Sequence, residues 1–401
     1  MQEQDIIICG GGIGGLSCAL CLEKQGFTTL ILEKSHSPAE AGAGIQLSPN
    51  AFHVLRHLGL EQEISKHAQF PEKIMMYDAP SGTALAYMPL IPHMERRHKA
   101  PYAVIHRADL HKTLYTRAQN SNKITIKHAS AISNFIDDGQ NITVQTVDRE
   151  NYSALALIGA DGLWSTIRNI ILSDGPPRYT GHVAWRAVVR RDKVEERFQA
   201  PETGLWMGER AHLVHYPISN GQLLNIVAII ESADPPSGWS TRGQAENLAL
   251  CFDSWDKSVS SLLKQVTEWR TWALYDRDPA PVWGVGRVTL LGDAAHPMLP
   301  FLAQGGAMAI EDASVLSSFL NNNLAEPRAA LRAYENTRIK RTARVTQTSV
   351  DNATMFHLGG NKRLLRNIAM KASQVAPGLL FRKFDWLYGY DALDEKLPVS
   401  D

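Results

Sequence analysis

The chain opens with apolar runs on either side of a helix-length segment. Within residues 5–9, the four residues after Asp5 are continuously apolar, which favours a strand buried on both faces in a parallel sheet. Apolar positions recur through residues 13–25, so we expect a helix that ends at Gly26. Residues 28–33 form a second buried-type strand. The first 33 residues are therefore predicted to be a β-α-β unit.

The middle of the chain is patterned as short strands. Residues 123–157 contain β-rich runs separated by polar turns, which predict an antiparallel meander. Residues 181–231 are also β-rich. Within them Asn220 and Gly221 predict a tight hairpin, because both residues adopt positive φ angles at low cost.

Helices and one more buried strand follow the same logic. Ser48, which precedes a proline, predicts an N-capped helix that ends at Gly59. Residues 287–291 read as a buried strand, and 305–321 and 327–356 read as helices. The pattern predicts an α/β protein with a Rossmann-like domain that is interrupted by a β-rich domain.

Composition narrows the class of protein without naming its chemistry. The 401 residues are 44% hydrophobic, which suits two associated globular domains. Lys plus Arg and Asp plus Glu both total 41, so no basic excess attracts nucleic acid or anionic lipid. The N-terminus lacks an export signal, and no stretch approaches the ~20 apolar residues of a membrane span. We expect a cytoplasmic enzyme, either a monomer or a homodimer, that acts on small ligands.

The cysteines do not predict a disulfide framework or a metal site. Cys18 and Cys21 form a C-x-x-C within the first predicted helix, but no second pair of zinc ligands accompanies them. Only four cysteines occur in the chain, which fits a reducing compartment. We therefore expect buried packing rather than redox work, and no bound metal.

A glycine-rich turn at residues 10–15 (GGGIGG) lies between the first strand and the first helix. Glycines at this place let a pyrophosphate approach the backbone and the positive end of the helix. Glu33 lies 18 residues beyond Gly15, at the end of the second strand, where a carboxylate can hold a ribose diol. Together the turn and the acidic residue predict dinucleotide binding.

Three later motifs decide between the dinucleotides. They occur in the order IHRADL at 105–110, GADGLWSTIR at 159–168 and GDAAHP at 292–297. With the glycine turn, these motifs resemble the single-component FAD-dependent aromatic hydroxylases, also called class A flavin monooxygenases. The chain looks most like the branch of salicylate hydroxylase, 3-hydroxybenzoate 6-hydroxylase and 6-hydroxynicotinate 3-monooxygenase. The motifs span residues 10–312.

The resemblance implies a glutathione-reductase-type FAD-binding domain with an inserted β-sheet substrate domain and C-terminal helices. The expected FAD-binding segments are 1–72, 101–178 and 275–355, the substrate-domain segments are 73–100 and 179–274, and the C-terminal helical segment is 356–401. It also implies non-covalent FAD, NADH or NADPH as co-substrate, and O₂, which reacts through a flavin 4a-hydroperoxide to hydroxylate a small phenolic or N-heteroaromatic acid. A second dinucleotide motif is absent, as expected when NAD(P)H docks transiently and the flavin swings out to meet it.

Residues that bind FAD follow from the glycine turn and the resemblance together. The resemblance implies that Arg107 bridges to diphosphate oxygens, that Asp293 accepts hydrogen bonds from the ribityl chain, and that Asp161 belongs to a segment that serves both FAD and NAD(P)H. An internal ion pair of Asp161 with Arg168 is the alternative for that residue. The full predicted set is Gly10, Gly12, Ile13, Gly14, Gly15, Glu33, Lys34, Gln46, Arg107, Ala129, Asp161, Asp293, Pro300, Gly305 and Gly306.

The substrate is expected beside the strand at 210–216. Alternation along it puts His212, Val214 and Tyr216 on one face and Leu213 on the other. The resemblance implies that His212 and Tyr216 line the pocket, with His212 as a general base for a phenol and Tyr216 as a hydrogen-bond partner. A structural histidine is the alternative for His212.

Other pocket residues carry open alternatives. Arg186 binds a substrate carboxylate or forms a buried ion pair. In the resemblance, Phe301 and Gln46 stand where enzymes of this branch carry histidines. Phe301 makes the predicted pocket more apolar, which leaves a quinone or quinolone hydroxylase as an alternative function. A non-catalytic flavin-binding module is a separate alternative. His296 is expected to fix its loop. The basic residues of 338–344 are expected to form a solvated helix face.

Overall fold

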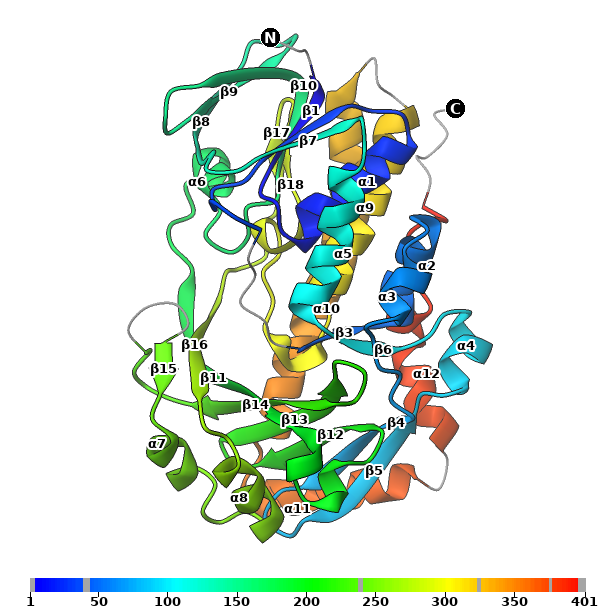
Figure 1. Cartoon of the computed structure of the whole chain (residues 1–401), viewed down its shortest axis with the longest axis vertical. Coiled ribbons are helices and arrows are strands. Elements are labelled where there is room, and N and C mark those ends of the chain that lie inside the picture. Colours follow the sequence, from blue (N-terminus) through cyan, green and yellow to red (C-terminus); the bar gives the residue numbers. More distant parts are fainter. Residues whose placement is uncertain (1–3, 39–43, 237–240, 323–325, 375–376, 396–401) are drawn as a thin grey trace.

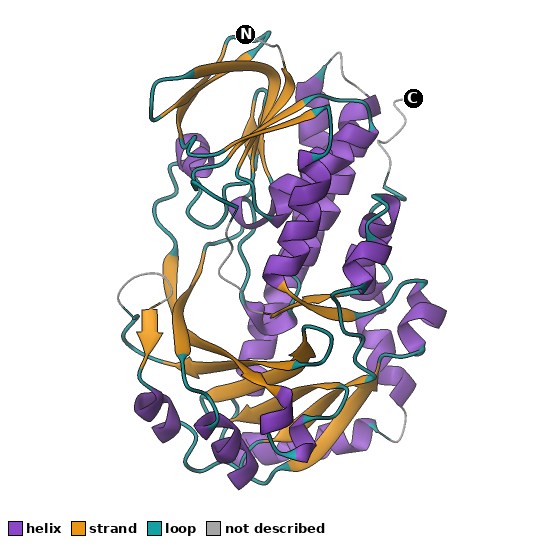
Figure 2. Ribbon diagram, viewed as in Figure 1, coloured by secondary structure: helices purple, strands orange, loops and turns teal. Residues whose placement is uncertain are grey.

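The protein is described by a computed structural model that covers residues 4–38, 44–236, 241–322, 326–374 and 377–395. Two large sheets lie at opposite ends of an elongated molecule, and a stack of long helices runs between them (Figures 1 and 2). Among the described residues, no helix is long and apolar enough to cross a membrane. The predicted α/β class is confirmed.

The first sheet is the Rossmann-like one, and its centre is parallel. β1 (Gln4–Cys9) lies between β10 (Asn151–Gly159) and β2 (Thr29–Leu32), with parallel pairing on both sides. Both faces of β1 are covered, which explains its apolar run: Ile6, Ile7 and Ile8 are at most 1% exposed. The remaining strands are β7 (Ile124–Lys127), β8 (Ile132–Asp137), β9 (Ile142–Thr146), β17 (Gly284–Val285) and β18 (Val288–Leu290).

One strand assignment was wrong in its pairing. Residues 123–157 were predicted to form one antiparallel meander, but β7 pairs parallel with β2 at the edge of the first sheet. Only β8, β9 and β10 form the antiparallel meander. Short β-rich runs look alike whichever neighbour they pair with, so local pattern alone did not separate β7 from the others.

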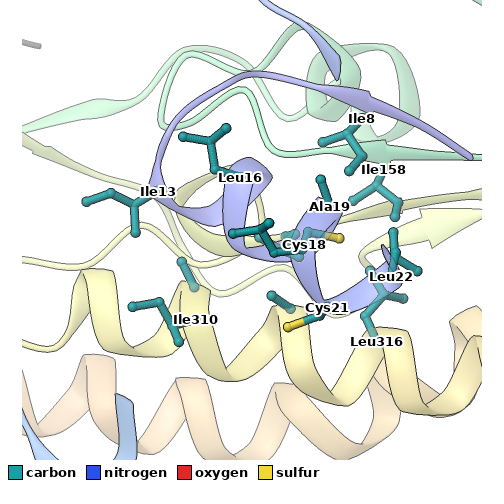
Figure 3. Close-up of a cluster of buried hydrophobic side chains, with 14 of the residues drawn as sticks. Ile8, Ile13, Leu16, Cys18, Ala19, Cys21, Leu22, Ile158, Ile310 and Leu316 are labelled. Carbon is teal, nitrogen blue, oxygen red and sulfur yellow. The ribbon is translucent and has the colours of Figure 1, made fainter. Parts of the chain in front are cut away.

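Helix α1 (Ile13–Lys24) packs between the first sheet and α9 (Gly305–Asn322), beside α5 (Arg107–Gln119). Cys18 and Cys21 lie in this interface with Leu16, Ile158 and other apolar side chains (Figure 3). Burial raises the pKa of the Cys21 thiol to about 12, which keeps it protonated. The prediction that these cysteines pack rather than react agrees with this arrangement.

The second sheet is built from two separate stretches of the chain. Its strands run in the order β15-β16-β11-β14-β13-β12-β4-β5. They are β4 (Lys73–Asp78), β5 (Thr83–Pro89), β11 (Arg178–Arg190), β12 (Glu202–Gly208), β13 (Ala211–Ile218), β14 (Leu223–Glu231), β15 (Thr241–Gly243) and β16 (Trp269–Asp276). The predicted hairpin joins β13 to β14, and Asn220 and Gly221 both have positive φ angles there.

A small sheet and further helices connect the two parts. β3 (Gly44–Leu47) pairs with β6 (Ala103–His106), and α2 (Pro49–His57) follows β3. Ser48 occupies the predicted N-cap position but does not cap with its side chain: its hydroxyl donates to Asn50 and accepts from Gln304 instead. The other helices are α3 (Glu61–Ser65), α4 (His93–His98), α6 (Thr166–Leu172), α7 (Ala245–Leu250), α8 (Lys257–Lys264), α10 (Pro327–Phe356), α11 (Gly360–Ser373) and α12 (Pro377–Tyr388).

The basic face of α10 is not solvated as predicted. Arg338 has no exposed surface and forms ion pairs with Glu311 (2.7 Å) and Asp312 (2.6 Å) of α9. Arg341 also pairs with Glu311, at 2.7 Å. The prediction failed because the carboxylate partners lie on α9. Without them, the spacing of charges along α10 looks like that of a solvent-exposed helix face. Only the outward residues Lys340 and Arg344 are exposed.

Breaking this cluster should destabilise the fold far more than removing an exposed charge. Arg338→Met leaves Glu311 and Asp312 buried without their cation, which costs about 3–5 kcal/mol of unfolding free energy. The matched control is Arg344→Met on the same helix, whose exposed guanidinium stacks on Trp386 and contributes less than about 1 kcal/mol. Urea denaturation of both variants measures the difference, and equal losses would contradict the account.

Candidate active site

Two cavities meet at Gly12, where the glycine turn leads into α1. The larger measures about 350 Å³ and the smaller about 110 Å³. The larger cavity lies where the carboxyl ends of the first sheet face strands β11, β13 and β14 of the second. Its lining comprises Gly12, Ile13, Gly14, Gly44, Ile45, Gln46, Arg107, Ala160, Gly162, Arg186, His212, Val214, Tyr216, Val227, Ile229, Leu291, Gly292, Asp293, Met298, Leu299, Pro300, Ala303, Gly305, Gly306 and Ala309.

The glycines of the turn serve two different purposes. Gly10 has a φ angle of +106°, and a Cβ there would lie 2.5 Å from the Ala160 carbonyl oxygen. A Cβ on Gly15 would lie 2.0 Å from the Gly10 carbonyl oxygen, so these two glycines allow the backbone to pack. By contrast, no atom lies within 4 Å of a Cβ built on Gly12. The open space at Gly12 therefore gives a phosphate access to the N-terminus of α1.

The smaller cavity is lined by a carboxylate and by flat side chains. Glu33 lines it, and its carboxylate accepts hydrogen bonds from the backbone N–H of Gly11 (2.7 Å) and Ser35 (2.8 Å). Burial on its own raises the pKa of Glu33, but these hydrogen bonds lower it, so the group stays charged. The rings of His111 and Tyr115 line the same cavity and offer flat surfaces for a base.

Polar groups of the larger cavity come from several elements. Asp293, in the turn after β18, exposes its side chain to the cavity. Burial raises the pKa of its carboxyl, and the nearby positive charges of His296 and Arg107 oppose that shift. Arg107 begins α5 and Gln46 lies on β3, where Tyr102 donates a short hydrogen bond to it. A polyol and a diphosphate would find an acceptor and a cation here.

The N-terminus of α9 also faces this cavity through Gly305 and Gly306. A Cβ on Gly306 would lie 2.8 Å from Ile45, so a larger residue would disturb the wall formed by β3. The positive end of this 18-residue helix can stabilise negative charge on a ring held against it. Backbone N–H groups at such a position suit the carbonyl oxygens of a flavin.

Strand β13 supplies the opposite wall and alternates as predicted. His212, Val214 and Tyr216 line the cavity, whereas Leu213 and His215 are buried on the other face. Tyr216 packs against Gly44 so closely that a Cβ at residue 44 would lie 2.4 Å from its ring. Burial keeps the pKa of the Tyr216 hydroxyl well above its usual range, so this group is a hydrogen-bond donor rather than a base.

Arg186 of β11 is a half-buried cation on the cavity wall. Its Nε makes no hydrogen bond with a described residue, and its guanidinium carbon lies 5.1 Å from the centre of the Trp272 ring. Burial lowers its pKa because less water stabilises the charge; Tyr216 opposes this shift and Arg107 adds to it. The alternative prediction was a buried ion pair, but no carboxylate among the described residues pairs with Arg186. The charge is therefore left for an anion in the cavity.

His212 is connected to residues that the sequence did not single out. Its Nδ1 lies 2.8 Å from Nε2 of His357, at the C-terminal end of α10. Nδ1 of His357 lies 3.1 Å from the Glu231 carboxylate, at the end of β14. Burial, reinforced by His357 and His182, holds the pKa of His212 well below its usual range. No local motif marks His357 or Glu231, because each reaches its partner only through the tertiary fold.

Several predicted residues lie near the cavities without lining them. Phe301 was expected on the wall but packs behind it, with its ring 5.1 Å from that of His212. The alternative of an Asp161–Arg168 ion pair is not formed: Asp161 accepts from Ser165 and the backbone of α6, and Arg168 pairs with Asp174 at 2.6 Å. Lys34 is exposed beside Glu33, and Ala129 bonds through its backbone to Ser35. His296 holds its loop by a 2.6 Å bond to Asp312, as predicted.

Comparison with known proteins gives consistent relatives. Residues 3–349 match the FAD binding domain family. The 3-hydroxybenzoate 6-hydroxylase of Polaromonas naphthalenivorans (strain CJ2) is 36% identical over 386 residues, which cover 96% of each chain. The 6-hydroxynicotinate 3-monooxygenase of Bordetella bronchiseptica (strain ATCC BAA-588 / NCTC 13252 / RB50) is 31% identical over 396 residues. The aligned region covers 98% of this chain and 96% of that protein.

A solved structure supports the fold independently. The salicylate hydroxylase substrate complex superposes with a TM-score of 0.84 at 24% identity and covers 99% of each chain. All three names fall in the branch that the sequence motifs predicted.

Gly12 offers a direct test of where FAD binds. Gly12→Ala adds a methyl group that meets no protein atom, so we expect normal folding but at least about tenfold weaker FAD binding, a loss of about 1.4 kcal/mol. Titration of the apoprotein with FAD, followed by flavin fluorescence, measures the affinity. Gly15→Ala is the contrasting variant, since its methyl clashes with backbone and should impair folding itself. Wild-type affinity in folded Gly12→Ala would remove Gly12 from the FAD site.

Proposed function

The chain belongs to the FAD binding domain family, as an FAD-dependent aromatic monooxygenase, and from this premise we propose that its substrate is a small aromatic acid whose ring carries a hydroxyl group. The enzyme uses FAD with NAD(P)H and O₂, as its family implies. When bound, FAD takes a hydride from the nicotinamide and activates oxygen for transfer to the ring. The residues present fit this cofactor along its whole length.

We assign the parts of FAD to the two cavities. Glu33 would hold the adenosine ribose in the smaller cavity, and Gly12 with Arg107 would face the diphosphate. In the larger cavity Asp293 would accept hydrogen bonds from the ribityl chain, and the start of α9 would face the ring. The wall opposite, formed by β11 and β13, is then left for the substrate.

The observation that carries the substrate class is Arg186. A half-buried guanidinium that pairs with no carboxylate in the described part of the chain is costly unless a ligand supplies the negative charge. A carboxylate is the simplest anion that a planar guanidinium binds through paired hydrogen bonds. The relatives' names support this choice, because 3-hydroxybenzoate and 6-hydroxynicotinate are both carboxylates with a ring oxygen.

The remaining groups suit a phenol held close to His212. An electrophilic oxygen attacks an aromatic ring most readily when the ring hydroxyl has lost its proton. His212 is neutral because burial depresses its pKa, so it is ready to accept that proton. Tyr216 remains protonated and can donate a hydrogen bond to the phenolate or the carboxylate. Together with apolar Val214, these groups orient the ring and keep water away from it.

A more lipophilic quinone or quinolone is the second candidate from the sequence, and the placement of Phe301 weakens it. That ring lies behind His212 and does not add an apolar surface to the cavity. We also propose a cytoplasmic location. It is supported by four cysteines that are all unpaired, three of them buried, as in proteins of reducing compartments.

Replacing Arg186 should separate carboxylated from uncharged substrates. For Arg186→Met we expect the KM of a hydroxybenzoate to rise about 100-fold, because a charged hydrogen-bonded pair is worth about 3 kcal/mol. The KM of phenol, which lacks a carboxylate, should change less than about threefold. The assay couples NAD(P)H oxidation to hydroxylated product across hydroxybenzoates, hydroxynicotinates, phenol and quinolones. Hydroxylation of quinolones alone, or peroxide formation without product, contradicts the proposal.

His212 should affect hydroxylation and not cofactor binding. His212→Ala removes the base, so kcat for hydroxylation should fall about 10²–10⁴-fold while FAD affinity is unchanged. In the wild type the lowered pKa means that the basic form of His212 persists as the pH falls through 6.5. The acid limb of kcat should therefore lie well below pH 6.5. Unchanged turnover in His212→Ala would show that this side chain is structural.

A further inference from the structure

A chain of hydrogen bonds leads from the substrate wall to the protein surface. It starts at His212, passes through His357 and ends at Glu231, with contacts of 2.8 and 3.1 Å. The side chain of His357 is 4% exposed, whereas that of Glu231 is 35% exposed and pairs with Arg210, which is 71% exposed. The chain thus connects the substrate wall of the cavity to surface water through the buried ring of His357.

The direction of each hydrogen bond is fixed by chemistry. A carboxylate can only accept, so Nδ1 of His357 must carry a hydrogen and donate it to Glu231. Nε2 of the neutral His357 ring is then an acceptor, and Nδ1 of His212 must donate to it. In neutral His212 this leaves Nε2 with its lone pair, which is the form that a general base needs. Glu231, two residues along the chain of bonds, therefore sets the tautomer of His212.

We propose that His357 and Glu231 form a proton relay that carries the proton of the bound phenol from His212 to the surface. This proposal rests on the proposed function, since it supplies the exit for the proton that His212 takes. The phenol O–H bond breaks and Nε2 of His212 gains the proton. Nδ1 of His212 passes its own proton to Nε2 of His357, and Nδ1 of His357 passes one to Glu231 or to water. One proton leaves, and one phenolate remains.

The reverse transfer resets the chain. When the product departs as a neutral phenol, it takes the proton from Nε2 of His212, and each ring regains a hydrogen at Nδ1. A relay is needed because His212 is a poor place for a proton to remain: burial and two neighbouring histidines disfavour its charged form. Burial also lowers the pKa of His357 to about 4, although Glu231 opposes that shift, so the proton moves onward.

Other charged or titratable groups surround His357 without joining the chain. Arg366 of α11 bonds the carbonyl groups of Met355 and Phe356. Nδ1 of His182 bonds the Thr180 carbonyl oxygen, and the His182 ring is 5.5 Å from that of His357. His182, Glu231 and His357 have ligand atoms within 4.8 Å of one another, so a stray divalent cation could bind them and block the relay. Experiments therefore include EDTA.

The test is proton release when substrate binds to the oxidised, FAD-loaded enzyme. The probe is 3-hydroxybenzoate, followed by any other phenolic acid that the wild type hydroxylates faster, mixed at pH 7.5 in weak buffer with phenol red. The wild type should release about one proton per bound ligand. His357→Gln and Glu231→Gln should release protons at least about tenfold more slowly, with the same FAD content and melting temperature.

Two further variants separate proton transfer from a structural role. Glu231→Asp keeps a carboxylate and should restore most of the release. His182→Gln changes a side chain outside the chain of bonds, so proton release should stay fast even though one neighbour that lowers the pKa of His212 is removed. Wild-type release and an unchanged pH profile in both His357→Gln and Glu231→Gln would overturn the relay. If the wild type hydroxylates no phenolic acid at all, the proposed function fails; if it does so while the variants release protons normally, only the relay fails.

Discussion

The active-site architecture depends on a buried charge cluster at the centre of α9. Asp312 accepts bonds from the backbone N–H of Gly292, from His296 and from Arg338, and Glu311 accepts from Asn50 and from Arg338. The cluster thus joins α10, the turn that carries Asp293 and the helix that follows β3. Burial alone raises the pKa of Asp312, but His296 and Arg338 lower it to about 2, so the carboxylate stays charged at physiological pH.

This linkage explains how one cavity draws its residues from distant parts of the sequence. Gln304, just before α9, bonds Ser48 and so fixes the start of α9 against the end of β3. Asp293, Gly305 and Gln46 are thereby held around one space. The other wall belongs to the second sheet, which supplies the half-buried cation Arg186 and the neutral His212 and therefore suits an anionic ring with a hydroxyl group.

Features that depend on short stretches of sequence were predictable, whereas features that depend on tertiary contacts were not. The glycine turn, Glu33 and the alternation of His212, Val214 and Tyr216 follow from short-range pattern. Arg338 looked solvated because its partners belong to another helix. His357 was missed for the same reason, since 145 residues separate it from His212 along the chain. The pairing of β7 was predicted wrongly because the neighbour of a strand depends on the whole fold and not on the strand's own four residues.

We propose that the cavity wall formed by β11 and β13 binds an aromatic acid between Arg186 and His212. A crystal structure of the FAD-loaded enzyme with 3-hydroxybenzoate tests it most directly. We expect the carboxylate within about 3 Å of the Arg186 guanidinium and the ring hydroxyl in hydrogen-bond contact with Nε2 of His212. A ring bound elsewhere, or bound with its carboxylate away from Arg186, would contradict the account.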